Sequence, residues 1–264
     1  MTEIRGTTIL LTGATGGIGQ AIARALAARG GRLILTGRRA DVLEPLAQEL
    51  GGRALAADLA DRDAPARLVA EAGEVDLLVA NAALPASGTL DDYTLEQVDR
   101  ALDVNLRAPI ALAKLLAEPM AARGRGHLVF ISSLSGKSAQ PGGSLYSATK
   151  FGLRGFALGL REDLRDRGVG VSTVFPGFIR DAGMFAEAGV ELPRGVGTRT
   201  PDDVAAGVLR AIEGNRAEVD VAPLGLRLGA LVSGVAPQLS ADVSRRLGNA
   251  RITRELADGQ RHKR

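Results

Sequence analysis

Near the N-terminus a short apolar run ends in a cluster of glycines. Residues Thr7–Thr12 lead into Gly-Ala-Thr-Gly-Gly-Ile-Gly, so that Gly13, Gly17 and Gly19 mark a turn before a helical pattern. Glycines in such a turn permit a tight bend and the close approach of a pyrophosphate, and the free N–H groups of the next helix favour an anion. A plain turn between a strand and a helix is the alternative. We expect a dinucleotide phosphate site here.

The same alternation of strand and helix continues along the chain. Apolar strand runs covered by helices on both faces are typical of a parallel sheet. The pattern predicts an α/β fold with one Rossmann-like, doubly wound parallel sheet of about seven strands, and a single domain over residues 1–264. The predicted strands are Thr7–Thr12, Arg32–Thr36, Arg53–Ala57, Val75–Ala80, Gly126–Ser132, Val169–Phe175 and Ala217–Val221, and the predicted helices lie near 17–29, 40–50, 62–72, 94–122, 144–167 and 202–213.

Two regions break this alternation. Residues 177–201 form a long glycine-containing segment that we interpret as a substrate lid. Its large apolar residues Phe178, Met184 and Phe185 suggest an apolar substrate pocket, and anchoring of the loop is an equal alternative. Residues 224–247 carry apolar side chains on one helical face, which predicts an amphipathic extension interrupted at Pro237. We expect it to pack on its own domain or on a second subunit, and a membrane-surface helix is the alternative.

Composition excludes several classes of protein. Lysine and arginine total 33 against 30 acidic residues, and aromatic residues make up only 3%, so a nucleic-acid surface is not expected. The chain has no cysteine, which excludes disulfides and thiolate metal sites, and we expect no metal. The absence of a signal-like start and of a long apolar stretch predicts a cytoplasmic protein.

The end of the second predicted strand bears on the choice of cofactor. An acidic residue there would bond the ribose 2′-OH of NAD, whereas arginine accommodates the 2′-phosphate of NADP. Gly37 occupies the expected acidic position, and Arg38 and Arg39 follow it. Because a guanidinium can hold a phosphate through two hydrogen bonds, we predict NADP(H), with Arg38 on the phosphate and Arg39 beside the adenine. The alternative is that both arginines only cap an exposed loop.

A second motif suggests proton transfer to a carbonyl oxygen. Tyr146 and Lys150 lie four residues apart in a helical pattern and share a face, and Ser133 directly follows the fifth predicted strand. A phenol can donate the proton, but its ordinary pKa is about 10. A nearby ammonium favours the phenolate and lowers that pKa, and a hydroxyl can hold a developing alkoxide. The two histidines, at 127 and 262, are not placed for a catalytic triad.

Together these motifs resemble the classical short-chain dehydrogenase/reductase family. The similarity covers the glycine spacing after Thr12 and the arrangement Ser133-x12-Tyr146-x3-Lys150, and it extends over residues 7–214. The resemblance implies that Tyr146 is the general acid/base. It also implies that Lys150 binds the nicotinamide ribose and tunes the tyrosine, and that Ser133 orients the substrate.

The resemblance assigns roles to further residues. It places Asn105 on a proton-relay water, Asp58 at the adenine, Asn81 beside the cofactor and Pro176-Gly177 next to the nicotinamide. Alternatively, Asn105 could satisfy neighbouring backbone groups, Asp58 could cap a helix and Asn81 could serve as a turn residue. The expected cofactor contacts are Gly13, Thr15, Gly17, Ile18, Gly19, Arg38, Arg39, Asp58, Leu59, Asn81, Ala82, Tyr146, Lys150, Pro176, Gly177 and Ile179.

Three positions depart from the family pattern. Ala80 and Ala83 replace the first Asn and the Gly of an Asn-Asn-Ala-Gly segment, which removes no catalytic group. Asp181 stands near the place of a threonine that holds the nicotinamide carboxamide in the family.

We therefore predict an NADP(H)-dependent oxidoreductase that interconverts a ketone or aldehyde and an alcohol. The resemblance further implies a homodimer or homotetramer formed through the long helices. One alternative is a non-catalytic NADP-binding sensor or interaction module, which would not need the Ser-Tyr-Lys set. Another is an epimerase or dehydratase of an extended relative, which usually has a larger substrate region and a different glycine spacing.

Overall fold

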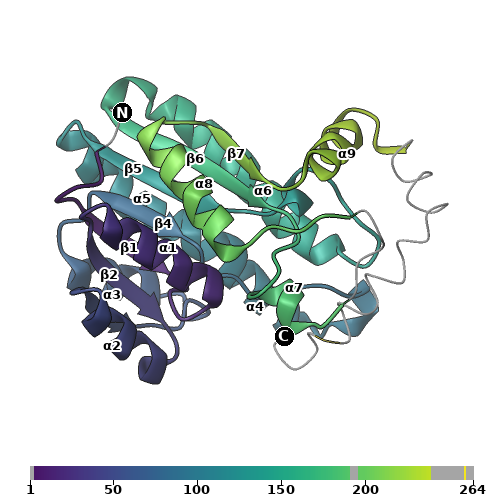
Figure 1. The fold of residues 1–264 in the computed structure, drawn as a ribbon, viewed down its shortest axis with the longest axis horizontal. Coiled ribbons are helices and arrows are strands. Elements are labelled where there is room, and N and C mark those ends of the chain that lie inside the picture. The colour runs from purple at the N-terminus through teal and green to yellow at the C-terminus, as the bar shows by residue number, and fades with distance from the viewer. Residues whose placement is uncertain (1–2, 191–195, 239–258, 260–264) are drawn as a thin grey trace.

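A computed structural model describes residues 3–190, 196–238 and 259 of the chain. Within these residues seven parallel strands form one sheet in the order β3-β2-β1-β4-β5-β6-β7 (Figure 1). This is the doubly wound order, in which the chain moves outward from β1 and then returns to place β4 on the other side of it. The predicted fold class is confirmed. The strands are β1 (Thr8–Thr12), β2 (Arg32–Gly37), β3 (Arg53–Ala56), β4 (Leu77–Ala80), β5 (Gly126–Ile131), β6 (Val169–Pro176) and β7 (Glu218–Val221).

Helices cover both faces of the sheet, and each face has its own apolar core. In β1, Ile9 and Leu11 point into one core and Leu10 into the other, as the two-residue period of a strand requires. The first core is closed by α1 (Gly17–Ala28), α2 (Ala40–Glu49) and α8 (Pro201–Glu213), and the second by α3 (Ala64–Ala72), α5 (Ala108–Ala122) and α6 (Ser144–Asp163).

The predicted helix over 94–122 is interrupted. The structure contains α4 (Leu95–Leu102), a π-helical turn η2 (Asp103–Arg107) and then α5. Pro109 lies just after this turn and has no N–H, so it cannot donate the bond to the Asn105 carbonyl that a regular α-helix would contain. The wider π turn accommodates this defect, and such turns often occur at functional sites.

The predicted helix over 144–167 also ends early. The α-helical part stops at Asp163, and a 3₁₀ turn, η4 (Arg165–Arg167), follows it. Gly168 then adopts the left-handed conformation with φ of 72°, which terminates the helical segment.

Backbone hydrogen bonds join the two ends of the predicted lid. Arg180 N donates to the Arg199 carbonyl, and Arg199 N donates to the Phe178 carbonyl, each at 2.9 Å. A short helix, α7 (Met184–Glu187), lies within the lid, and residues 191–195 are outside the described part of the chain. The two ends of the lid are therefore held together at its base.

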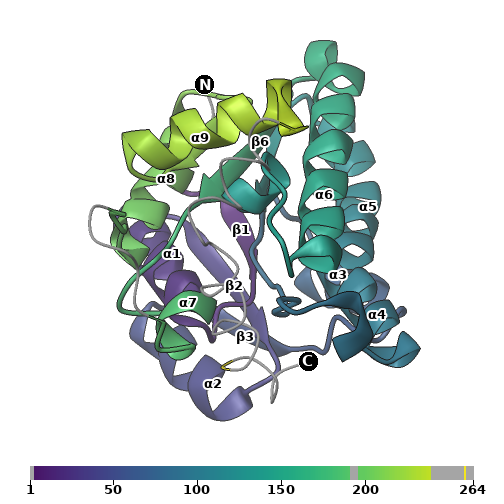
Figure 2. The same ribbon diagram turned by 90° about the vertical axis from the view of Figure 1, so that its right-hand side faces the viewer.

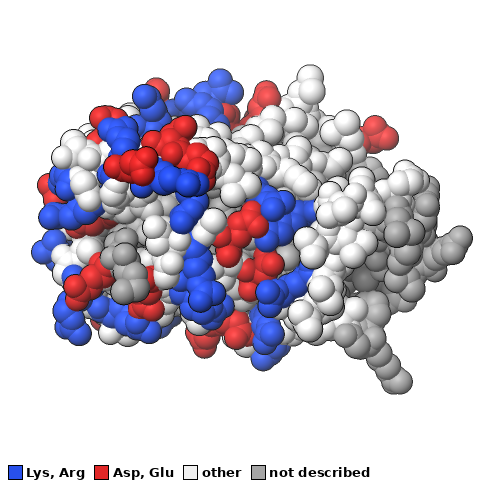
Figure 3. All heavy atoms as spheres, turned by 90° about the horizontal axis from the view of Figure 1, so that it is seen from above, with Lys and Arg blue, Asp and Glu red and all other residues white. Residues whose placement is uncertain are grey.

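The predicted C-terminal extension begins as expected with α9 (Leu224–Val235) and stops before Pro237, whereas residues 239–247 lie outside the described range. This helix follows β7 at one end of the molecule (Figures 1 and 2). Leu224 is 66% exposed and Val235 is 81% exposed. Among the residues of α9, all of which the structure describes, only Ala230 is buried. Figure 3 shows uncharged side chains at this end and mixed charges over the rest of that face. None of the described helices has the length and apolar character needed to cross a membrane.

One buried titratable group lies in the sheet itself. His127 of β5 is fully buried, and its Nε2 lies 2.8 Å from the Ser172 hydroxyl of β6. Burial, together with the nearby Arg161 guanidinium, lowers the pKa of His127 to about 3. Between about pH 3 and pH 6.5 the folded chain therefore keeps this imidazole neutral, whereas the unfolded chain protonates it.

This arrangement predicts a loss of stability in mild acid. Below the unfolded pKa near 6.5 the unfolded state binds a proton that the folded state refuses, so stability is fully present above pH 6.5 and falls as the pH drops toward 3. The free energy of unfolding can be measured with urea at pH 7.5 and at pH 5.5. Its decrease between these two pH values should be about 1.4 kcal/mol smaller in His127→Gln than in the unmodified chain. Equal pH dependence in both proteins would contradict this account.

Candidate active site

The glycine turn forms a close-packed cradle at the start of α1. Gly13 has a φ of 67°, and a Cβ at this position would lie 2.7 Å from Ala82 Cα. A Cβ at Gly19 would lie 2.2 Å from the Gly13 carbonyl oxygen. The first turn of α1 has no acidic side chain, so its N–H groups remain favourable for an anion. These positions can take only glycine, and the cradle fits a dinucleotide phosphate.

Thr12 and Asn81 tie this cradle to the end of β4. The buried Thr12 hydroxyl accepts hydrogen bonds from the backbone N–H groups of Asn81 and Ala82, both at 3.0 Å. The Asn81 amide in turn donates to the carbonyl oxygens of Thr12 and Gly13, both at 3.1 Å. Asn81 is therefore more than a turn residue, because it fixes the geometry of the glycine turn across the β1–β4 switch point.

The two arginines after β2 have different surroundings. Arg39 Nη2 donates to the Thr15 carbonyl oxygen at 2.6 Å, which brings its guanidinium to the glycine turn. Arg38 is exposed. A Cβ at Gly37 would lie 2.8 Å from Thr15 Cγ2, so an acidic side chain there would have to displace Thr15. The structure thus leaves Arg38 accessible and gives a packing reason for Gly37.

Asp58 and Leu59 lie at the carboxyl end of β3. The Asp58 carboxylate accepts from the Ala60 N–H at 3.1 Å and lies 3.6 Å from Arg100 Nη2. Asp58 therefore closes a local turn, but it does not cap α3, which begins at Ala64. Leu59 is buried in the second core.

Ser133, Tyr146 and Lys150 come together at the carboxyl end of β5. Ser133 follows β5, whereas Tyr146 and Lys150 lie one turn apart on α6. Burial raises the pKa of Tyr146 to about 12, and a hydrogen bond with Ser133 acts in the opposite direction. Ser133 therefore favours the phenolate form of Tyr146, whereas burial favours the neutral phenol.

Lys150 is buried, and its Nζ donates to the Ile131 carbonyl oxygen at 3.1 Å. Burial lowers the pKa of this ammonium to about 8. The Nζ atom lies 5.5 Å from the centroid of the Tyr146 ring. The sequence predicts that Lys150 lowers the pKa of Tyr146, but here the pKa of that tyrosine is raised. Desolvation of the phenolate outweighs the effect of Ser133. The Lys150 ammonium is held on a backbone carbonyl.

Asn105 is buried in the π turn, where it faces the segment after β4. Its Oδ1 accepts from Leu84 N at 2.6 Å, and its Nδ2 donates to the Leu84 carbonyl at 2.9 Å. The side chain thus satisfies neighbouring backbone groups, which is the plainer alternative considered above. Its proposed role on a relay water stays a prediction.

The segment after β6 lies against the cradle. Gly177 N donates to the Val221 carbonyl at 3.0 Å, and Ile179 is buried. A Cβ at Gly17 would lie 2.3 Å from the Ala182 side chain, a contact that the spacing of the sequence does not reveal. Asp181 has a φ of 70°, a conformation in which the family's β-branched threonine would be strained. The backbone conformation at Asp181 is therefore unfavourable for a threonine.

Comparisons with known proteins agree with this geometry. The family model for short chain dehydrogenase matches residues 7–191. A ketoacyl reductase, HetN, of Nostoc sp. is 36% identical over 84% of this chain and 80% of its own. The 3-oxoacyl-[acyl-carrier-protein] reductase FabG of Rickettsia conorii is 35% identical over 68% of this chain and 76% of its own. A short-chain dehydrogenase from Sphingobium yanoikuyae, solved in complex with NADPH, has a TM-score of 0.77 and 29% identity, covering 89% of this chain and 95% of that one.

Two buried threonines allow a matched test of the tie between β1 and β4. Thr12→Val leaves two backbone N–H groups without their acceptor, which should lower the free energy of unfolding by about 2 kcal/mol. Thr36 is equally buried, but its hydroxyl has no hydrogen-bond partner among the described residues, so Thr36→Val should be neutral or stabilising. Equal effects of the two substitutions in urea unfolding would show that the Thr12 hydroxyl does not hold the turn.

Proposed function

The chain belongs to the short-chain dehydrogenase family and is an oxidoreductase of that family, and from this we propose that it uses NADP(H) to interconvert a ketone or aldehyde and an alcohol. The observation that carries the proposal is the grouping of Ser133, Tyr146 and Lys150 at the carboxyl end of β5, where the Lys150 Nζ lies 5.5 Å from the centroid of the Tyr146 ring. The glycine cradle at the same edge of the sheet supports a bound dinucleotide.

A nicotinamide held at the glycine cradle would supply a hydride to the substrate carbon in reduction and would accept one in oxidation. Tyr146 donates its phenolic proton to the carbonyl oxygen in the direction of reduction and removes it in the direction of oxidation. Ser133 holds the substrate oxygen and stabilises the phenolate through its hydrogen bond. Lys150 keeps a positive charge at neutral pH, because its pKa near 8 is still above 7.

The preference for NADP(H) rests on residues at the carboxyl end of β2. Arg38 is exposed, and the neighbouring Gly37 stands where an acidic residue would bond the ribose 2′-OH of NAD. The Arg39 guanidinium is held on the glycine turn. A structural neighbour was solved with NADPH, which is consistent with this choice.

The substrate proposal is an apolar carbonyl compound. Phe178 and Phe185 of the lid pack with ring centroids 5.0 Å apart and could cover an apolar group. Two relatives are named as a ketoacyl reductase and a 3-oxoacyl-carrier-protein reductase, so ketones are the first compounds to test.

We also propose a homo-oligomer that forms through α5 and α6. Leu115 of α5, and Phe151 and Leu158 of α6, are large apolar residues that remain 38–41% exposed. Both helices lie on the same flank of the sheet (Figure 2). Covering these side chains would remove apolar surface from water, which is the main driving force for association.

The catalytic assignment predicts the behaviour of two tyrosine variants. Tyr146→Phe should lower turnover of a carbonyl panel roughly 10²- to 10⁴-fold, because the proton donor is lost. NADPH binding, followed by nicotinamide fluorescence, should persist. Tyr93→Phe is the matched control, since it removes only a hydroxyl that donates to the Ser87 carbonyl. Turnover retained by Tyr146→Phe would refute the assignment, and a folded chain that binds NADPH but reduces nothing would favour the sensor alternative.

The cofactor assignment predicts a selective loss of affinity. Arg38→Ala should weaken NADPH binding by about 10- to 100-fold, as expected for a charged hydrogen bond worth about 1.5–3 kcal/mol, and leave NADH binding unchanged. Arg32→Ala, at the opposite end of β2, is the control. Equal losses for the two nucleotides in a fluorescence titration would mean that Arg38 does not read the 2′-phosphate.

A further inference from the structure

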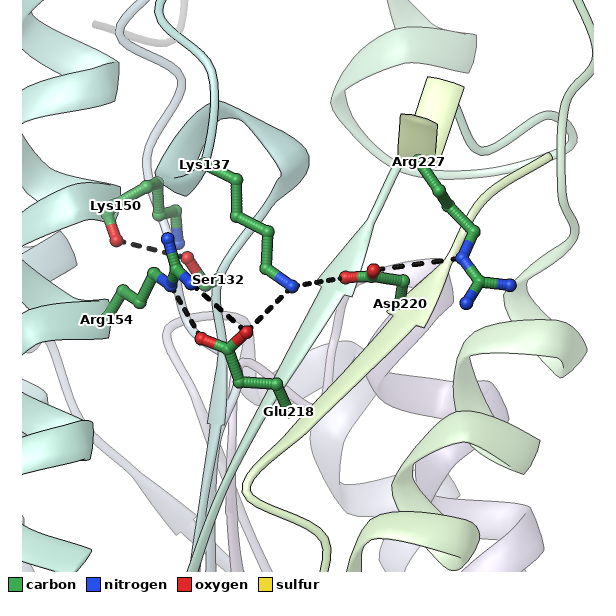
Figure 4. Close-up of polar contacts among 7 residues, drawn as sticks. All are labelled: Ser132, Lys137, Lys150, Arg154, Glu218, Asp220 and Arg227. Carbon is green, nitrogen blue, oxygen red and sulfur yellow. Dashed lines mark hydrogen bonds and ion pairs between the residues drawn. The ribbon is translucent and has the colours of Figure 1, made fainter. Parts of the chain in front are cut away.

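A partly buried charge network lies between the two elements that carry the proposed catalytic hydroxyls (Figure 4). Lys137 Nζ lies 2.7 Å from Asp220 Oδ1 and 2.9 Å from Glu218 Oε2, and it sits 4.1 Å above the Phe175 ring. The Lys137 side chain is only 14% exposed. The two carboxylates hold this partly buried ammonium in place, because they offset the cost of removing its charge from water.

On one side the network holds the loop that begins at Ser133. A single 3₁₀ turn, η3 (Leu134–Gly136), separates Ser133 from Lys137. Its backbone bonds run from Gly136 N to the Ser133 carbonyl and from Lys137 N to the Leu134 carbonyl. A turn this tight has little freedom, so the position of Lys137 limits the position of Ser133.

On the other side the network holds α6. Arg154 Nε and Nη2 contact the two carboxylate oxygens of Glu218 at 2.6 and 3.2 Å. Tyr146, Lys150 and Arg154 are spaced by four residues and share one face of α6. A fork of two hydrogen bonds fixes orientation as well as distance. Glu218 is therefore the carboxylate that joins the helix of Tyr146 to the loop of Ser133.

We propose that Glu218, through its contacts with Lys137 and Arg154, is a positioning residue that sets the alignment of Ser133 with Tyr146. The proposal rests on the function proposed for these two hydroxyls. It extends the site to edge strand β7, which contributes no group to the reacting atoms. Hydrogen bonds from both cations keep Glu218 ionised despite its burial, and the pKa of its carboxyl is lowered. Glu218, which together with Lys137 and Arg154 forms what we call the clamp, is thus in its charged state at neutral pH.

The direct test observes Tyr146 without any substrate. The chain has two tyrosines and no tryptophan, so Tyr93→Phe protein carrying ¹³Cζ-labelled tyrosine gives one signal, that of Tyr146. Ser133→Ala in this background records the shift caused by loss of the hydroxyl contact. We expect Glu218→Gln to move the Tyr146 signal toward the position seen in Ser133→Ala. Glu118→Gln, which loses a surface pair with Arg167, should leave it in place.

Kinetics provides the second readout. With a carbonyl substrate that the unmodified enzyme reduces, Glu218→Gln should lower kcat by roughly 10- to 100-fold, as expected for a small misplacement of reacting groups, while the KM and the Kd for NADPH hold. Lys137→Met should behave in the same way, and Lys137→Arg should restore part of kcat because it keeps the charge. In a Ser133→Ala background the Glu218 substitution should have little further effect, since the two act through one contact.

The outcomes separate the clamp from the proposed function. An unmoved Tyr146 signal and unchanged kcat in folded Glu218→Gln or Lys137→Met would overturn the clamp. Failure of both variants to fold would also overturn it, because the network would then serve stability alone. If no carbonyl is reduced by the unmodified chain, the proposed function fails, whereas the NMR comparison still decides whether Glu218 aligns the two hydroxyls.

Discussion

Parallel pairing of the strands determines where this chain can do chemistry. Every strand ends at the same edge, and the switch point between β1 and β4 lies there. The buried Thr12 hydroxyl fixes the backbone at this point by accepting hydrogen bonds from two backbone N–H groups at the end of the neighbouring strand. The glycine cradle and the Ser133–Tyr146 pair come from separate parts of the chain. They lie at one site only because the strands that carry them end at this common edge.

Burial has opposite consequences for the pKa values of Tyr146 and Lys150, which both lie on α6. Desolvation raises the pKa of Tyr146 and lowers that of Lys150, so each group is displaced toward its neutral form. A proton donor benefits from remaining protonated until substrate arrives, but it must also be able to release its proton. The Ser133 hydroxyl is the contact that favours release in this structure. Small changes in its position therefore matter more here than they would at an exposed tyrosine.

The sequence was sufficient for features that depend on local pattern. Strand runs, the glycine turn and the four-residue spacing of Tyr146 and Lys150 predict the sheet and the cluster of site residues. The break within 94–122 was missed because the apolar period continues through it, although Pro109 was a signal that a regular helix would be disturbed there. The direction of the pKa shift at Tyr146 was missed because desolvation depends on how tightly the site closes, which no spacing reports.

The charge network was also beyond local pattern, since its members come from positions 137, 154, 218 and 220. A partial signal exists in the alternation Glu-Val-Asp-Val of β7. Its valines face the first core, so both acids must point to the opposite side of the strand, where α6 supplies Arg154. Asp220 also lies 3.7 Å from Arg227 of α9, and Gly234 of that helix approaches the Lys137 carbonyl. Through these contacts the start of the C-terminal helix lies against the charge network, and its end lies near the loop of Ser133.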